Sequence, residues 1–122
     1  MSFAPVFATL SVSTAVKAQI GSNPVRCYPV NDAPQGVALP YATYQQIAGG
    51  PENYLGQAPD IDGGLVQIDV YAATVTAARA AFLAIRDAVE AVAYVTAVRE
   101  EGRDPDTKNV HLSMDTDWLT SR

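Results

Sequence analysis

The chain has 122 residues, 48% of them apolar, which suits one domain with one hydrophobic core. Its formal net charge of −5 argues against sequence-independent binding of nucleic acid and against docking on an anionic membrane. Cys27 is the single cysteine and His111 the single histidine, so we expect no intrachain disulfide and no zinc site built from Cys and His ligands of one chain. No signal-peptide pattern is present and no apolar run approaches roughly 18 residues, so the sequence predicts a soluble protein made inside the cell.

The N-terminal segment, residues 2–20, is predicted to form one helix. Ser2 can cap it, and Pro5 is tolerated in a first turn. Val6, Leu10 and Ser13 follow one another at steps of four and three, and Ile20 comes seven residues after Ser13, which is the spacing of one helix face. Gly21 is a typical stop signal at the end of a helix.

Five strand candidates follow, at residues 25–30, 41–48, 65–71, 94–99 and 110–118. Residues 65–71 alternate in hydropathy, which places Val66, Ile68 and Val70 on one face and Gln67, Asp69 and Tyr71 on the other. The last candidate alternates in the same way. Its predicted core face holds Val110, Leu112, Met114, Thr116 and Trp118, and its polar face His111, Ser113, Asp115 and Asp117.

Residues 74–92 give the clearest helix pattern. Its apolar stripe is spaced at three and four residues, and comprises Val75, Ala78, Phe82, Ile85, Val89 and Val92. Thr74 or Thr76 can cap the start, and Arg86 lies four residues before Glu90. We interpret the stripe as the face that packs on the sheet.

This order of elements predicts an α+β domain that spans residues 1–122. It has two layers, with a mainly antiparallel sheet of four to five strands and two helices packed on one face. Residues 49–64 are rich in Gly and Pro and longer than an ordinary loop, which favours an extended hairpin or arm that contacts a partner.

Ionisable residues gather on the predicted polar face of the sheet. Asp69, His111, Asp115 and Asp117 are candidates for a metal or acid–base site, but their spacing is that of any half-buried sheet, and a hydrated face is the favoured interpretation. A nucleophilic Cys27 would need His111 as its base, and a small buried thiol is favoured instead. We therefore expect no catalytic, metal-binding or cofactor-binding residues.

Several segments together carry a resemblance to a known family. They are residues 34–41 (PQGVALPY), residues 49–55 (GGPENYL), residues 65–71 (LVQIDVY) and the alanine-rich helix with Arg79 and Arg86. In order and spacing the chain resembles the tail-completion (tail-terminator) proteins of long-tailed bacteriophages, prophages and gene transfer agents. The resemblance extends over nearly the whole chain.

The resemblance implies a structural virion protein of the tail and neck region, assembled in the bacterial cytoplasm, and not an enzyme. Family members form a ring, usually a hexamer, at the head-proximal end of the tail tube. The ring ends tail polymerisation and offers a surface for head–tail joining. The implied partners are further copies of the chain, the major tail tube protein and the connector or stopper proteins, while DNA passes through the lumen without specific binding.

Aromatic and loop residues are the candidates for the assembly interface, since aromatic side chains are enriched at interfaces. They are Tyr54, Leu55, Asp60, Ile61, Asp62, Tyr41 and Tyr44. Two other functions stay open: a head-completion or neck subunit, and a small-ligand binding module with an enclosed apolar pocket. An enzyme ranks third, and it would depend on Asp69, His111 and Asp115.

Overall fold

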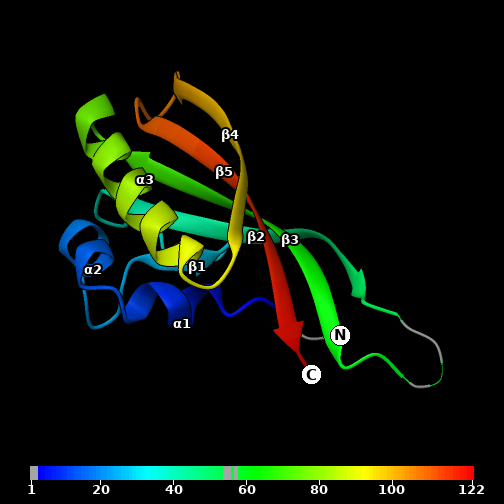
Figure 1. The fold of residues 1–122 in the computed structure, drawn as a ribbon. Coiled ribbons are helices and arrows are strands. Elements are labelled where there is room, and N and C mark those ends of the chain that lie inside the picture. Colours follow the sequence, from blue (N-terminus) through cyan, green and yellow to red (C-terminus); the bar gives the residue numbers. More distant parts are fainter. Residues whose placement is uncertain (1–2, 54–55, 57) are drawn as a thin grey trace.

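The computed structural model describes residues 3–53, 56 and 58–122 (Figure 1). Within these residues three helices pack on one face of a five-stranded sheet, which confirms the predicted α+β class. The elements in chain order are α1 (Val6–Ser11), α2 (Thr14–Ile20), β1 (Cys27–Pro29), β2 (Tyr41–Pro51), β3 (Ile61–Ala72), α3 (Val75–Glu90), β4 (Tyr94–Arg103) and β5 (Val110–Ser121).

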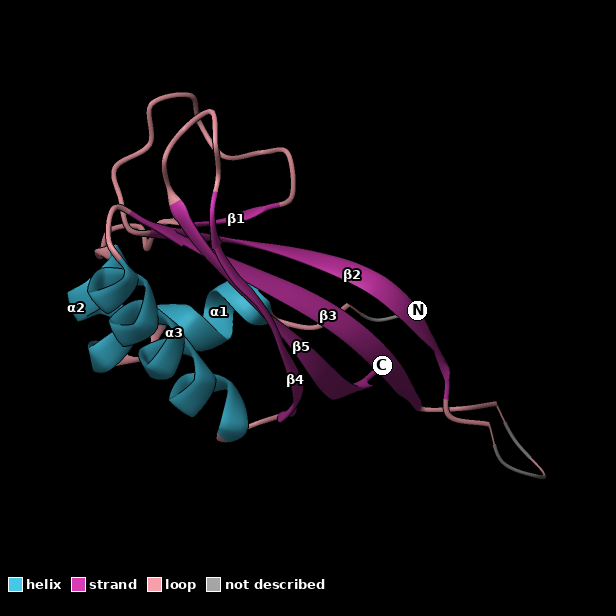
Figure 2. Ribbon diagram, turned by 90° about the horizontal axis from the view of Figure 1, so that it is seen from above, coloured by secondary structure: helices cyan, strands magenta, loops and turns pink. Residues whose placement is uncertain are grey.

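The sheet has the strand order β1-β2-β3-β5-β4. β2, β3, β5 and β4 pair antiparallel, and β1 alone is parallel to its neighbour β2. Figure 2 shows the three helices on one side of this twisted sheet and no helix of the described chain on the other. We call the side without helices the open face; it carries Tyr71, Asp69 and Gln67 of β3 and their cross-strand neighbours.

α3 buries its predicted stripe against the sheet. Ala78, Phe82, Ile85 and Val89 are all buried, in contact with the apolar residues of β3 and β5. The Oγ1 atom of Thr74 accepts a hydrogen bond from the backbone N–H of Ala77 at 3.1 Å, so Thr74 is the cap. The ends of the stripe were predicted wrongly, because Val75 and Val92 are exposed and the helix ends at Glu90.

The N-terminal segment differs from the predicted single helix. It forms α1 and α2, separated by a break in which Ser13 caps α2 by accepting a hydrogen bond from the N–H of Val16 at 3.2 Å. A serine hydroxyl competes for backbone N–H groups and favours a cap over a helix interior, which explains the break. The sheet is therefore covered by three helices instead of two.

Pro5 and Gly21 mark the two ends of this helical segment. Pro5 lies at the N-cap position of α1 and not in its first turn, while the proposed cap Ser2 lies outside the described residues. Gly21 ends α2 with φ of +82°, a backbone conformation that L side chains rarely adopt. The predicted stop signal is thereby confirmed.

The sequence predicts an irregular segment over residues 49–64, but both ends of this segment are strand in the structure. Cross-strand pairs join Gly49 to Gly64, Gly50 to Gly63 and Pro51 to Asp62, so these residues extend β2 and β3. Pro51 ends β2, a position at which the missing N–H is tolerated. The result is a long hairpin that projects beyond the helices (Figures 1 and 2).

Candidate assembly surfaces

Stacked rings cover one end of the open face. Tyr41, Tyr71 and His111 form one row across β2, β3 and β5. The ring centroids of Tyr41 and Tyr71 are 4.9 Å apart, and those of Tyr71 and His111 are 4.8 Å apart, both stacked. Burial, followed by the nearby carboxylate of Asp69, raises the pKa of Tyr71. These rings lie beside the row that contains Asp69 and help to bury it.

That next row centres on the buried carboxylate of Asp69. Its Oδ1 atom accepts hydrogen bonds from Ser113 Oγ at 2.5 Å and Gln67 Nε2 at 3.0 Å, and lies 3.0 Å from His111 Nε2. Because three donors converge on one oxygen, the cluster fixes the side chains of two adjacent strands.

The geometry of this cluster is not that of a nucleophilic relay. A serine nucleophile needs a hydrogen bond to the imidazole that takes its proton, but Ser113 and His111 both reach Asp69. Cys27 is buried, and burial raises the pKa of its thiol to about 12, which suppresses the thiolate. The described residues contain no group of three or more His, Cys, Asp and Glu side chains that could hold a metal ion.

The remaining acidic candidates on this face lie apart from Asp69. Asp115 is buried and binds Arg99, whose Nε donates to Oδ2 at 2.8 Å, while its Oδ1 has no donor among the described residues. Asp117 is exposed. The prediction of a hydrated face is thus wrong in part, because Asp69, Ser113 and Asp115 are buried by their own neighbours.

The hairpin carries three of the candidate interface residues at its base. Asp60 and Ile61 are exposed, but Asp62 is only 1% exposed. The guanidinium of Arg122 donates three hydrogen bonds to the Asp62 carboxylate at 3.1–3.3 Å. The backbone N–H of Arg122 also donates to the carbonyl of Asp60 at 2.9 Å, so the C-terminal residue fixes the base of the hairpin.

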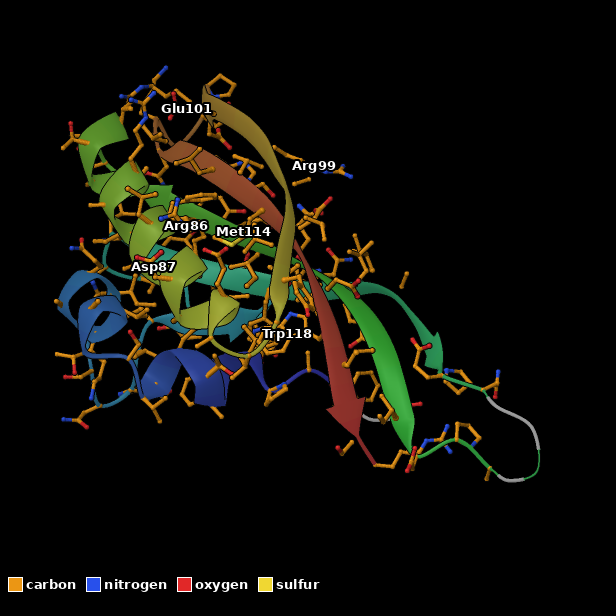
Figure 3. All side chains as sticks on the ribbon, viewed as in Figure 1. Arg86, Asp87, Arg99, Glu101, Met114 and Trp118 are labelled. Carbon is orange, nitrogen blue, oxygen red and sulfur yellow. The ribbon has the colours of Figure 1, made fainter. Side chains whose placement is uncertain are left out.

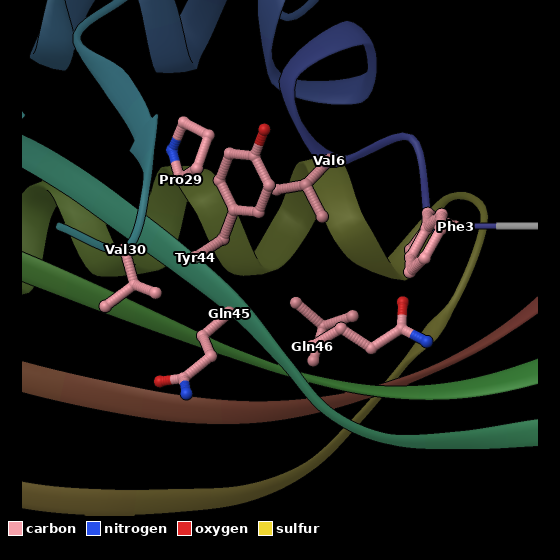
Figure 4. A pocket seen from close by; sticks show the side chains of 9 residues that line it. Phe3, Val6, Pro29, Val30, Tyr44, Gln45 and Gln46 are labelled. Atoms are coloured by element: carbon pink, nitrogen blue, oxygen red, sulfur yellow. The ribbon is translucent and has the colours of Figure 1, made fainter. Parts of the chain in front are cut away.

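The other candidate interface residues do not join these into one patch. Tyr54 and Leu55 lie outside the described residues. Tyr41 lies on the open face, whereas Tyr44 lines a cleft on the helix side of the sheet (Figure 4). Burial, followed by the charges of Cys27 and Asp32, raises the pKa of Tyr44.

This cleft lies beside the end of β1 and has a volume of about 400 Å³. Its lining is mainly apolar and includes Phe3, Val6, Val30, Tyr44, Gln46 and Val66. It is open to solvent, unlike the enclosed pocket that a small-ligand module would need. An open apolar groove at a sheet edge is better suited to a protein segment.

Sequence reasoning missed exposed apolar residues on β4. Tyr94 is 71% exposed and Val98 is 63% exposed. Residues 94–99 form strand as predicted, within β4, but the place of β4 at the edge of the sheet depends on pairing that the sequence does not reveal.

Two arginines of α3 lie on its exposed side. Arg79 binds Glu101 of β4 through two hydrogen bonds of 2.7 and 2.6 Å, which hold the pKa of Glu101 below its ordinary value. Arg86 lies 3.4 Å from Glu90, the predicted pair, and 3.0 Å from Asp87. Figure 3 shows Arg86 and Asp87 on α3, and Glu101 and Arg99 on β4.

Comparison with known proteins identifies the family. The model of the family described as "Tail completion protein gp17" matches residues 4–121. The chain belongs to this family. A search of curated protein sequences found no match.

A solved structure shows the same fold. It is a chain of the "Virion of native gene transfer agent (GTA) particle", with a TM-score of 0.73 and 15% identity, and the match covers 96% of this chain and 92% of that one. The chain is therefore a structural protein of the phage-tail class. Within the described residues, no helix of this tail-completion protein has the length and apolar character needed to cross a membrane.

Proposed function

We propose that the protein forms a hexameric ring at the head-proximal end of the tail tube. There it ends tail polymerisation and presents the surface to which the connector or stopper proteins of the head attach. The observation that carries this proposal is the family match over residues 4–121. The likeness of the fold to a chain of an assembled gene transfer agent supports it.

The chemistry of the chain agrees with a structural part. A ring through which DNA slides should hold it weakly, and a net charge of −5 disfavours tight contact with phosphates. The polar cluster on Asp69 is built as a fixed acceptor and not as a nucleophile with its base. In this proposal the protein is no enzyme, needs no cofactor, and is assembled into particles in the host cytoplasm.

The projecting hairpin is the proposed contact with a neighbouring subunit or the tube. Asp60 and Ile61 are exposed at its base, and Tyr54 and Leu55 belong to the same segment. Asp62 serves a different purpose in this scheme, because its ion pair with Arg122 holds the hairpin in place. Tyr41 and Tyr44 would contact partners from the two faces of β2.

Electron micrographs of particles made without the protein test this function. A tail terminator predicts tails of uncontrolled length, separate from filled heads. Tails of normal length that fail to join heads would identify a neck subunit instead. Normal, infectious or DNA-transferring particles would refute both assignments. Native mass spectrometry of the terminator assembled on tubes measures the number of subunits.

Replacement of residues 53–60 by a two-residue Asn-Gly turn tests the hairpin. The strands and the Asp62–Arg122 ion pair remain, so the variant should unfold at a temperature close to that of the wild type. We expect it to leave tails uncapped. A variant that keeps its fold by circular dichroism and still yields normal particles would show that the hairpin is dispensable.

A further inference from the structure

The two edges of the sheet differ in how they are covered along their length. On one edge, β1 pairs only with residues 42–44 of β2, and Val30 donates its N–H to the carbonyl of Tyr44. From Gln45 to Pro51 the outer side of β2 has no strand partner within the described chain. At the other edge the outer side of β4 is likewise unpaired within the described residues. Unpaired edges are templates for another strand.

Each of the two edges has a segment without charged residues. Residues 45–51 of β2 carry no charge, and neither do residues 94–98 of β4. The charged half of β4 begins at Arg99. Cross-strand pairing places Arg99 in the row of Thr43, which β1 already covers. Residues 94–97 of β4 therefore lie at the level of residues 45–48, in the free part of β2, and Val98 lies one row further, level with Tyr44 and the end of β1.

Cross-strand pairing shows which residues of β4 and β2 lie in the same row of the sheet. One row runs Gln45–Gln67–Asp115–Ala97, and another runs Ala48–Leu65–Asp117–Tyr94. β2, β3, β5 and β4 also alternate in direction. A rotation about an axis roughly along the strands thus brings β4 of one copy antiparallel to β2 of the next, as in a closed heterologous ring.

The apolar cleft offers a site for a side chain of the added strand. Val98 pairs with Met114 of the core face, so it points to the helix side of the sheet, yet it is 63% exposed. In a neighbouring copy the cleft opens on the same side, beside Tyr44 and Gln46 (Figure 4). Strand addition of this kind takes affinity from main-chain hydrogen bonds and specificity from such pockets.

We propose that β4 of one copy, through residues 94–97, pairs antiparallel with residues 45–48 of β2 in the next copy. Val98 then follows at the end of the neighbour's β1, where its side chain enters the cleft. This interface deepens the proposed function and rests on it. The occupant is a second copy of this chain, because its own far edge has the matching direction, level and lack of charge.

A disulfide between copies tests the pairing directly. Gln45→Cys and Ala97→Cys are combined in one chain, which is assembled into particles and then oxidised. The two positions lie three strand spacings apart within a subunit, roughly 14 Å, which is too far for an internal disulfide. The native Cys27 does not compete, because it is buried and its thiol pKa is about 12.

We expect a non-reducing gel to show a ladder of disulfide-linked subunits, up to the size of the closed ring. Each single-cysteine variant should remain monomeric on the same gel. Particles with normal tail length that contain only monomeric double-cysteine protein would overturn the edge pairing and leave the terminator function intact. Failure of the function itself would appear separately, as tails of normal length in particles that lack the protein.

Val98→Glu provides a second measurement. A charge in the apolar cleft of the neighbour should reduce particles of regulated tail length by about tenfold or more. Leu83→Glu is the matched control, because Leu83 is an apolar residue that is 46% exposed on α3 and not on an edge strand. Wild-type yields from Val98→Glu would contradict the interface. Equal losses from both variants would contradict it as well, since the effect would then not depend on the edge.

Discussion

The two faces of the sheet are buried by different means, although the same strands build both. On the helix-covered face, Val66, Ile68 and Val70 of β3 pack against α3 and its neighbours. On the open face, Asp69 is also buried, but its neighbours are polar partners and stacked rings. Alternation along one strand thus produces an apolar core and a polar network side by side.

The difference separates two physical roles. Apolar contacts on the helix side are non-directional and supply most of the stability. Hydrogen bonds to Asp69 contribute less net free energy, but they are directional and leave a large penalty if a partner is lost. We therefore expect the helix side to determine whether the chain folds, and the open face to determine how rigidly β3 and β5 are held.

The largest expected effect comes from Phe82→Asp on α3. The Phe82 side chain is 7% exposed within the core, so the substitution places an unpaired charge against the sheet. The cost should be about 4 kcal/mol or more, enough to prevent folding of a marginally stable domain. Circular dichroism and thermal unfolding measure it.

The neighbouring Leu83 is the control for this experiment, because it is 46% exposed on the same helix. Leu83→Asp should fold with nearly wild-type stability. A cooperative, soluble Phe82→Asp variant would mean that the helix packs with a different side toward the sheet.

An intermediate effect is expected from Asp69→Ala on the open face. The change leaves Ser113, Gln67 and His111 without their common acceptor, at a cost of about 2 kcal/mol. Urea unfolding at neutral pH measures it, with exposed Asp117→Ala as the control on the same face. Equal stabilities of the two variants would show that the Asp69 network does not contribute.

Sequence patterns predicted the helix-covered face better than the open one. Periodicity of two in β3 and of three to four in α3 is enough to assign Val66 and Phe82 to the core. Burial of Asp69 was missed, since it depends on which strand lies beside β3. Pairing with β5 brings Ser113 and His111 to its carboxylate, and no local signal encodes that pairing.

The same limit explains the errors in the candidate interface. Residues 49–64 contain turn formers, yet pairing across the hairpin makes strand of Gly49 and Gly64. Asp62 resembled an exposed loop acid, but the distant Arg122 binds it. In contrast, Thr74 was identified correctly as a candidate cap because capping acts over three residues.

Alkaline pH should weaken both faces together. Burial raises the pKa of Cys27 from 9.0 to about 12, and burial also raises the pKa of Tyr71 above 10.0. Between the ordinary and the raised pKa the folded state binds more protons than the unfolded state. For Cys27, stability is therefore complete below about pH 9 and falls as the pH rises from there toward 12, by up to about 1.4 kcal/mol per pH unit. For Tyr71 the loss has the same sign, begins near pH 10, and is smaller because the side chain is partly exposed to water.

Chemical unfolding across this pH range can separate the contributions. Cys27→Ala and Tyr71→Phe should each give a shallower loss of stability with pH than the wild type. A slope unchanged in the Cys27→Ala variant would mean that the thiol titrates in the folded protein as it does in the unfolded chain.

The smallest expected loss of stability comes from a substitution that acts on the helix side alone. Thr74→Ala removes the hydroxyl that accepts the N–H of Ala77 and should cost about 1 kcal/mol. Thr76→Ala is the matched control, because the sequence allowed either threonine to cap and the structure assigns the bond to Thr74. We expect the Asp69 network to be unaffected, so hydrogen exchange should increase at the start of α3 and not along β3 or β5. Faster exchange on both sides would instead mean that the first turn of α3 and the open face unfold as one unit.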